Sequence, residues 1–259
     1  MVISTTHPRT ANGLRRIHRI AAHARRSAQT RHSARFEIAA LTGLYAVYEV
    51  VRGVRHASLH VAIGHALEIV RLERALHVYE ELHVQRALEH PTAVLTVLAF
   101  AYPLLHVLAT LGVLAWAYRA RPTPYPTIRT ALVATTALAL VVYIGYPVAP
   151  PRLAGLGIRD LVSADTPFNL SSSMLGRLYN PVAAVPSLHF AYALLMGAML
   201  ILLSRRRATR VAGALLPVVT LIVIVATGNH FFADAAVGGV VAAFGFAIGI
   251  AICPAPQHH

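Results

Sequence analysis

Two stretches near the carboxyl end decide how this chain folds: residues 186–204 read PSLHFAYALLMGAMLILLS, and residues 227–252 read TGNHFFADAAVGGVVAAFGFAIGIAI. Each stretch opens with a few polar residues and continues as an apolar run of the length and composition of a membrane helix. A basic turn and one more apolar segment, residues 205–226, separate the two stretches. This arrangement predicts a helical hairpin that returns both polar openings to the same side of a membrane.

The composition of the whole chain also indicates a membrane protein. Its 259 residues are 56% hydrophobic and only 13% charged, and the mean hydropathy is +0.59. These values lie far from those of soluble domains. We therefore expect an all-α, polytopic membrane protein that forms a bundle of six transmembrane helices with an amphipathic interfacial helix. The predicted spans are residues 36–52, 93–118, 130–146, 188–203, 211–227 and 231–252.

The charge distribution predicts an orientation and a domain organisation. The net charge of +13 comes from arginine alone, and eight of the 23 arginines lie in the first 35 residues. Under the positive-inside rule, residues 1–35 are a disordered cytoplasmic arm, residues 36–252 the membrane domain and residues 253–259 a short tail. Binding of nucleic acid by the arm is not expected, because no aromatic residue precedes Phe36. The prediction is a multi-pass protein of the cytoplasmic membrane with both termini inside.

Asp234 and His230 form the first candidate pair of functional residues. An ionisable residue at membrane depth is costly and therefore marks a functional site by default. Asp234 is the only acidic residue after Asp165, and it follows His230 by four positions, so both side chains share one helix face. A carboxylate that fixes one imidazole nitrogen leaves the other nitrogen available as a nucleophile or base.

His189 and Arg152 extend this candidate site. His189 lies in the first turn of a helix that follows Pro186, where Ser187, Leu188 and His189 offer unpaired N–H groups to an anion. Arg152 lies at the same predicted face and can bind two phosphate oxygens at once. Each residue alone has a structural alternative, as a packed polar group or an interface anchor. Their joint occurrence on one face favours an active site at the extracytoplasmic side.

Residues 66–90 predict an amphipathic helix on the membrane surface. His77, Glu80 and Glu81 have the spacing of metal ligands on such a helix, but the exposed polar face of the helix is the favoured interpretation. No metal ion or other cofactor is expected. We expect this helix and the loop of residues 153–185 to cover the site. Gly245 and Gly249 predict close packing of the last helix.

Three segments together resemble the motifs of a known family. These are residues 147–152 (PVAPPR), 180–189 (NPVAAVPSLH) and 228–234 (GNHFFAD). They are similar to the type 2 phosphatidic acid phosphatase superfamily, and the branch they resemble most includes the aureobasidin-sensitive inositol phosphorylceramide synthases. The resemblance extends over residues 36–252 and implies a membrane bundle of six helices.

The resemblance also implies roles for single residues. His230 is expected to form a phosphohistidine, Asp234 to orient it, and His189 to protonate the leaving alcohol. Arg152 and the segment of Ser187 and Leu188 are expected to bind the substrate phosphate, without a metal ion.

The chain departs from the phosphatases of this superfamily at three points. Val223 and Ile224 stand where those enzymes have a Ser-Arg pair, Leu188 replaces a glycine, and the first motif has no lysine. These departures favour the synthase-like branch. Accessory contacts to the phosphate are expected from Arg52, Arg177, Asn180 and Asn229.

The sequence thus predicts a membrane lipid phosphotransferase or phosphatase. Its donor would be a phospholipid or prenyl phosphate in the surrounding membrane lipids, and its acceptor a polyol, a sugar or water. The residues leave hydrolysis and transfer open. One alternative is a proton-coupled transporter that uses the same histidines as a relay, although no inverted repeat is visible. Another is an inactive scaffold of the same fold.

Overall fold

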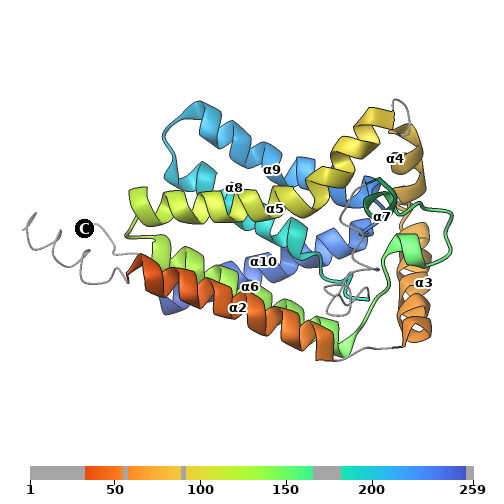
Figure 1. Cartoon of the computed structure of the whole chain (residues 1–259), viewed down its shortest axis with the longest axis horizontal. Coiled ribbons are helices and arrows are strands. Elements are labelled where there is room, and N and C mark those ends of the chain that lie inside the picture. Colours follow the sequence, from red (N-terminus) through yellow and green to blue (C-terminus); the bar gives the residue numbers. More distant parts are fainter. Residues whose placement is uncertain (1–32, 55–57, 89–91, 166–181, 255–259) are drawn as a thin grey trace, which may run out of the picture. The chain divides into compact units, whose positions relative to one another are not determined.

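The computed structural model describes residues 33–54, 58–88, 92–165 and 182–254. The chain divides into two units, Met1–Gly43 and Leu44–His259, and the described part of the first unit is little more than the first half of α2. The described residues form helices joined by short connections, without a β-strand (Figure 1). The helices are α2 (Ala34–Val54), α3 (Leu59–Ala75), α4 (Glu81–Ala87), α5 (Thr92–Ala120), α6 (Tyr125–Gly145), the 3-10 helix η1 (Pro151–Leu153), α7 (Leu161–Asp165), α8 (Leu188–Leu203), α9 (Arg207–Ala226) and α10 (Phe232–Ile252).

The all-α membrane architecture is confirmed, whereas the count of six spans is not. In the described part of the chain, α5, α6, α9 and α10 are long and apolar enough to cross a membrane, and α8 is apolar but has only 16 residues. At about 1.5 Å per residue, α8 is roughly 24 Å long, somewhat less than a hydrocarbon core of about 30 Å. The α2 helix has 21 residues but is not among the candidate spans.

Two helices begin four or more residues earlier than the sequence predicted, at their cytoplasmic ends in the predicted orientation. The α6 helix starts at Tyr125 and not at residue 130, because Pro126 falls in its first turn, where a missing N–H is tolerated. The α9 helix starts at Arg207, so that only Ser204, Arg205 and Arg206 remain in the turn after α8. Arginine is a good helix former, and the basic run therefore continues the helix.

Small residues bring α10 close to its neighbours. A β-carbon on Gly245 would lie 2.0 Å from Thr135 Oγ1 in α6, and one on Gly249 would lie 2.7 Å from the carbonyl oxygen of Thr127. The predicted packing role of this glycine pair is thereby confirmed. Large apolar side chains such as Val141 and Phe244 point away from the protein. This is the pattern expected where lipid surrounds a helix bundle.

The segment 66–90 differs from its prediction in two ways. It forms two helices, α3 and α4, because His77 adopts a left-handed conformation with φ of 57° and breaks the helical run. The polar face was expected to be exposed, yet Glu73 and Glu81 are 1% and 0% exposed. Leu72, on the apolar face of α3, is 54% exposed. The interpretation of all charges in this segment as a solvated face is therefore wrong.

Candidate active site

The first two motif segments are held together through their backbones. Val148 donates its N–H to the carbonyl of Val182 (2.9 Å), and the N–H of Ala184 is bonded to the carbonyl of Val148 (3.1 Å). This short parallel pairing is supported by the Tyr143 hydroxyl of α6, which donates to the carbonyl of Pro186 (2.7 Å). The backbone that leads into α8 is therefore fixed next to the proline-rich segment after α6.

The third motif segment is bonded to both of the others. Arg152 donates its backbone N–H to the carbonyl of Gly228 (3.0 Å), and Ser187 donates its N–H to the carbonyl of Asp234 (3.0 Å). Gly228 has φ of +69°, and a β-carbon there would lie 2.7 Å from Ile158. Glycine is needed at this position for both reasons. The structure thus brings together three segments that lie far apart in the sequence.

The imidazole of His230 is fixed in one tautomer. Its Nδ1 lies 3.0 Å from the carbonyl oxygen of Ala184 and 3.2 Å from Asp234 Oδ2. The carbonyl of Ala184 can only accept a hydrogen bond, so Nδ1 carries the proton. The lone pair is then on Nε2, which has no hydrogen-bond partner among the described residues. The pairing of His230 with Asp234 that the sequence predicted is present, and Asp234 is completely buried.

His189 lies beside His230, with a distance of 5.7 Å between the ring centres. Two side chains that each form a hydrogen bond of about 3 Å to one phosphate group can have their rings at such a separation. The ring of His189 is stacked on Tyr102 (4.4 Å between centres) and meets His106 edge-on (4.0 Å). Both aromatic neighbours come from α5, and the sequence analysis did not identify either of them.

Arg152 is oriented by two polar side chains. Its Nε donates to Asp160 Oδ2 (3.2 Å), and Nη1 donates to Asn229 Oδ1 (2.5 Å). The Asn229 amide in turn donates to the hydroxyl of Thr227 (2.9 Å). Only 7% of the Arg152 side chain is exposed. A guanidinium has five N–H donors, so these two contacts are compatible with binding of a phosphate. Asn229, the residue directly before His230, therefore holds the guanidinium of Arg152 in place.

Ser187 caps α8. Its side-chain oxygen accepts the N–H of Phe190 (3.4 Å), while its own backbone N–H is bonded to Asp234. The backbone N–H of Ser187 is thus engaged within the protein, and a contact from Ser187 to a phosphate would have to come from its hydroxyl hydrogen. Leu188, which was predicted beside it in the phosphate site, is the first helical residue and is buried.

Comparison with known protein families agrees with this geometry. The family model described as the PAP2 superfamily matches residues 67–248. The chain belongs to this superfamily. No curated protein and no solved structure matches the chain. Membership in the PAP2 superfamily indicates phosphatase or phosphotransferase chemistry, and the predicted resemblance is confirmed at this level.

Three of the predicted accessory residues receive no structural support. Arg177 and Asn180 lie outside the described residues, and so does the side chain of Arg52 in α2. About half of the loop 153–185 is likewise outside them, from residue 166 to residue 181. The described part of this loop includes α7 and Asp160, the partner of Arg152.

The sequence analysis did not identify the acidic residues of α3 and α4 that lie against the candidate site. Glu73 Oε1 accepts the backbone N–H of Ala233 (2.7 Å), and Glu81 Oε1 accepts that of Phe232 (3.0 Å). Gln85, one turn after Glu81, donates to the carbonyl of Ala226 (2.9 Å) at the end of α9. The available signal was the i, i+4 spacing of Glu81 and Gln85. Through these bonds, both helices contact the end of the bundle that carries His230.

The metal alternative for this segment finds no ligand set. His77 lies in the turn between α3 and α4, Glu80 pairs with His83 (2.6 Å), and Glu81 points into the protein. These three residues therefore do not converge as they would on one helix. No group of three or more His, Cys, Asp or Glu that could hold a metal ion occurs in the described ranges.

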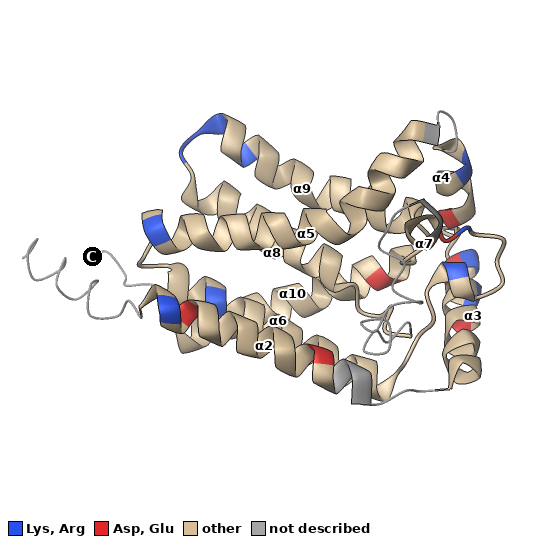
Figure 2. Cartoon of the chain, in the orientation of Figure 1, with Lys and Arg blue, Asp and Glu red and all other residues tan. Residues whose placement is uncertain are grey.

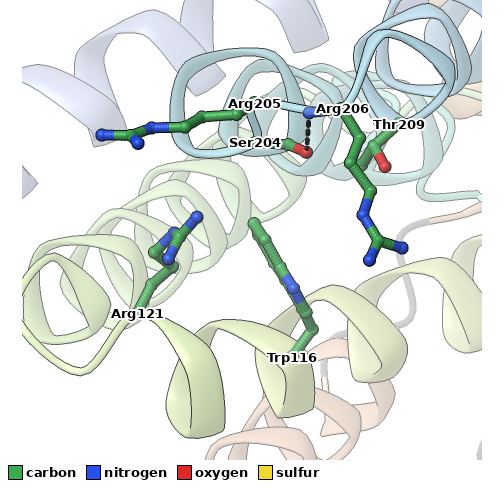
Figure 3. A pocket seen from close by; sticks show the side chains of 6 residues that line it. All are labelled: Trp116, Arg121, Ser204, Arg205, Arg206 and Thr209. Atoms are coloured by element: carbon green, nitrogen blue, oxygen red, sulfur yellow. Dashed lines mark hydrogen bonds between the residues drawn. The ribbon is translucent and has the colours of Figure 1, made fainter.

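A hollow of about 400 Å³ lies at the other end of α8 (Figure 3). Trp116 and Arg121 of α5 line it, together with Ser204, Arg205, Arg206 and Thr209 around the turn into α9. It contains no histidine or carboxylate and is separated from His189 by almost the whole length of α8. This hollow is therefore not part of the PAP2 site.

Proposed function

We propose that this protein is an integral membrane phosphotransferase or phosphatase that acts on a phosphorylated lipid through a phosphohistidine at His230. One observation carries the proposal. The Nδ1 atom of His230 faces two hydrogen-bond acceptors, so Nε2 has the lone pair, and the ring of His189 is 5.7 Å away. A nucleophile oriented by a carboxyl group, with a second imidazole beside it, supplies the two groups that phosphoryl transfer through a phosphohistidine needs.

In the first step, His230 Nε2 attacks the phosphorus atom of the lipid. The bond between phosphorus and the alcohol oxygen of the lipid breaks, and protonated His189 gives its proton to that oxygen. His230 becomes a phosphoimidazolium, and its positive charge is stabilised by the buried carboxylate of Asp234. His189 is left neutral, and the free lipid alcohol departs.

In the second step, the acceptor hydroxyl attacks the phosphohistidine. Neutral His189 removes the proton of this hydroxyl, the bond between phosphorus and Nε2 breaks, and both histidines return to their initial states. With water as the acceptor the product is inorganic phosphate. With a polyol or sugar the product is a phosphorylated alcohol.

Arg152 is the cation we assign to the phosphate oxygens, with Ser187 at the start of α8 as a second donor. The bonds to Asp160 and Asn229 orient the guanidinium in advance, so less conformational entropy is lost when a phosphate binds. The positive end of the α8 dipole adds to this stabilisation. These roles are consistent with the short distance between the three motif segments.

The finer assignment is a synthase-like enzyme, related to the inositol phosphorylceramide synthases, at the outer face of the cytoplasmic membrane. Val223 and Ile224, which replace the Ser-Arg pair of the phosphatases, are both buried in α9. A donor in the membrane, a phospholipid or prenyl phosphate, would reach the site from the bilayer. The acceptor would be a polyol or sugar hydroxyl, or water. The transporter and scaffold alternatives have no comparable support from the family match.

The experiment uses the full-length protein in lipid nanodiscs. It is incubated with phospholipids and prenyl phosphates that carry ³²P, with and without polyol acceptors, and quenched under alkaline conditions that preserve phosphohistidine. We expect a labelled protein in the wild type and none in His230→Ala, with turnover reduced by at least about 10³-fold. His189→Asn is expected to label more slowly, because the leaving alcohol is no longer protonated.

The matched control is His83→Ala, since His83 is an exposed histidine of α4. It is expected to behave like the wild type. Undiminished turnover in His230→Ala would contradict the mechanism. Proton-coupled uptake into sealed vesicles without any cleavage of the labelled lipids would instead favour a transporter.

A further inference from the structure

Two buried glutamates at the start of α10 have no part in the mechanism described above. Glu73 of α3 and Glu81 of α4 accept the N–H groups of Ala233 and Phe232, while Asp234 accepts that of Phe231 (2.9 Å). Three successive N–H groups of the first turn are thus bound by three carboxyl groups from three helices. The first N–H groups of a helix have no partner within the helix, so each of them needs an external acceptor.

This arrangement exceeds what capping of a helix requires. A cap is normally one Ser, Thr, Asp or Asn at the start of the helix itself, whereas Phe231 occupies that position here. Burial of a carboxyl group is expensive unless hydrogen bonds or a positive potential compensate for it. The N-terminal end of α10 supplies both. The same turn carries Asp234 and follows His230 directly.

The two glutamates interact with each other as well. The second carboxyl oxygen of each is buried and receives no N–H or O–H from the described residues. The carboxyl groups are close enough for a hydrogen bond between them, which requires one shared proton. Burial, followed by this neighbouring carboxyl group, raises the pKa of Glu73 to about 8. At neutral pH Glu73 therefore keeps its proton.

Few other charges face the pair. Asp234 approaches from α10 and disfavours a second negative charge. Tyr79 lies near both glutamates, and the guanidinium of Arg74 stacks on its ring, 4.9 Å from the ring centre. The charge state of the pair is thus set mainly by burial and by its acidic neighbours.

We propose that Glu73 and Glu81 form a carboxyl pair that positions the catalytic residues by holding the first turn of α10, and thereby the Asp234 carboxylate, against the imidazole of His230. This inference rests on the proposed function. Both glutamates are buried and bonded to the start of α10, so we assign them a role that acts through Asp234 and His230. Because α3 and α4 also cover this end of the bundle, a displacement of either helix is transmitted directly to the nucleophile.

Unlike a simple helix cap, the carboxyl pair makes activity and stability depend on pH. Above about pH 8 Glu73 ionises, and its buried negative charge then lies beside the carboxyl groups of Glu81 and Asp234. Activity then falls. The free energy of unfolding changes in the same direction. The folded protein holds the proton of Glu73 up to about pH 8, whereas the unfolded chain releases it near pH 4.5. The stability that this proton contributes is therefore complete below pH 4.5 and is lost as the pH rises to about 8.

The test compares Glu73→Gln, Glu73→Ala and Glu81→Ala with Glu80→Ala, a change at an exposed neighbour of Glu81. Glutamine keeps an acceptor for Ala233 and a donor for Glu81, but it cannot ionise. We expect Glu73→Gln to retain kcat near pH 7 and to lose the part of the alkaline decline that ionisation of Glu73 causes, whereas any decline caused by deprotonation of His189 remains. Either alanine variant should lose about 10- to 100-fold in kcat with little change in KM, because one buried hydrogen bond to a charged group is removed. Glu80→Ala should match the wild type.

A second measurement does not depend on catalysis. Hydrogen exchange of the peptide that contains residues 228–236, in nanodiscs at pH 7, should become at least about threefold faster in Glu73→Ala and unchanged in Glu73→Gln and Glu80→Ala. Unchanged exchange in Glu73→Ala would overturn the inference. The inference would also be overturned if Glu73→Gln showed the same decline of activity at high pH as the wild type. If the alanine variants do not fold, the result for Glu73→Gln alone decides. Failure of the proposed function would instead appear as an active His230→Ala.

Discussion

The polar side chains at the two ends of α8 differ in burial and in hydrogen bonding. At its start, His189, the neighbouring His230 and Asp234 are held by hydrogen bonds and ring contacts, and Asp234 is completely buried. At its end, Arg205 and Arg206 are exposed around an open hollow (Figure 3). Figure 2 shows arginines without acidic residues around the turn after α8, whereas α3 and α4 carry both acidic residues and arginines.

This difference shows which polar residues are under geometric constraint. A buried polar group is expensive unless it is paired, so its partners fix its position within a few tenths of an ångström. An exposed arginine beside a membrane needs no partner, because water and lipid headgroups solvate it. Substitutions at the start of α8 should therefore reduce activity far more than substitutions at its end.

Among the residues around the nucleophile His230, the largest effect is expected at Asp234. In Asp234→Asn the side-chain amide can direct N–H groups toward His230, which favours the wrong tautomer. The carbonyl of Ala184 still accepts from Nδ1, at 3.0 Å, and limits the loss. We expect kcat to fall by about 10²-fold, whereas the loss of a carboxylate without such a second acceptor reaches about 10⁴-fold. Steady-state turnover of a labelled lipid phosphate measures it, and a variant with more than half of wild-type activity would contradict the role.

A smaller effect is expected at Arg152. Arg152→Lys keeps the charge but loses the fork that bonds Asp160 and Asn229 at the same time. We expect kcat/KM to fall by about 10- to 50-fold, which corresponds to about one or two lost charged hydrogen bonds. Binding of vanadate, an analogue of five-coordinate phosphorus, should weaken in parallel. Arg159→Lys is the matched control in the same loop, and an equal loss there would refute the assignment.

The third prediction concerns the contact between α10 and the start of α8. A β-carbon on Gly238 would lie 2.5 Å from the carbonyl oxygen of Ser187, whereas one on Gly239 would meet nothing closer than Leu194 Cδ1 at 3.4 Å. Gly238→Ala should therefore displace the start of α8, with a loss of about 1–3 kcal/mol in stability and about fivefold in kcat. Thermal unfolding and turnover measure the two effects. Gly239→Ala should be close to wild type, and equal effects would show that this close approach is unimportant.

The smallest effect is expected at the basic end. Arg205→Gln and Arg206→Gln, alone or together, should leave kcat and KM in nanodiscs within about twofold, because surface charges rarely contribute more than about 1 kcal/mol. In the predicted orientation these arginines help to keep the turn after α8 on the cytoplasmic side. A change in topology on their removal would be detected by a reporter fused at the carboxyl end. A loss of more than tenfold in activity would mean that the two ends of α8 are coupled.

Much of the site could be predicted from the sequence because its residues lie next to apolar helices. His230 and Asp234 are one helical turn apart, and a lone carboxylate in an apolar run has few structural explanations. The approach of Arg152 to Gly228 is different, since 76 residues separate them and only backbone hydrogen bonding joins them. The charge pattern predicted that these segments share one membrane face, and the resemblance to a family supported their placement in one site.

The sequence by itself determined the apolar segments, the polar breaks between them and the i, i+4 pair of His230 and Asp234, because helical periodicity and hydrophobicity are local properties of a chain. Only the tertiary structure decided that Glu73 and Glu81 face the start of α10 while Leu72 faces outward. Periodicity shows which residues of a helix share a face. It does not show whether that face meets water, lipid or the unpaired N–H groups of another helix.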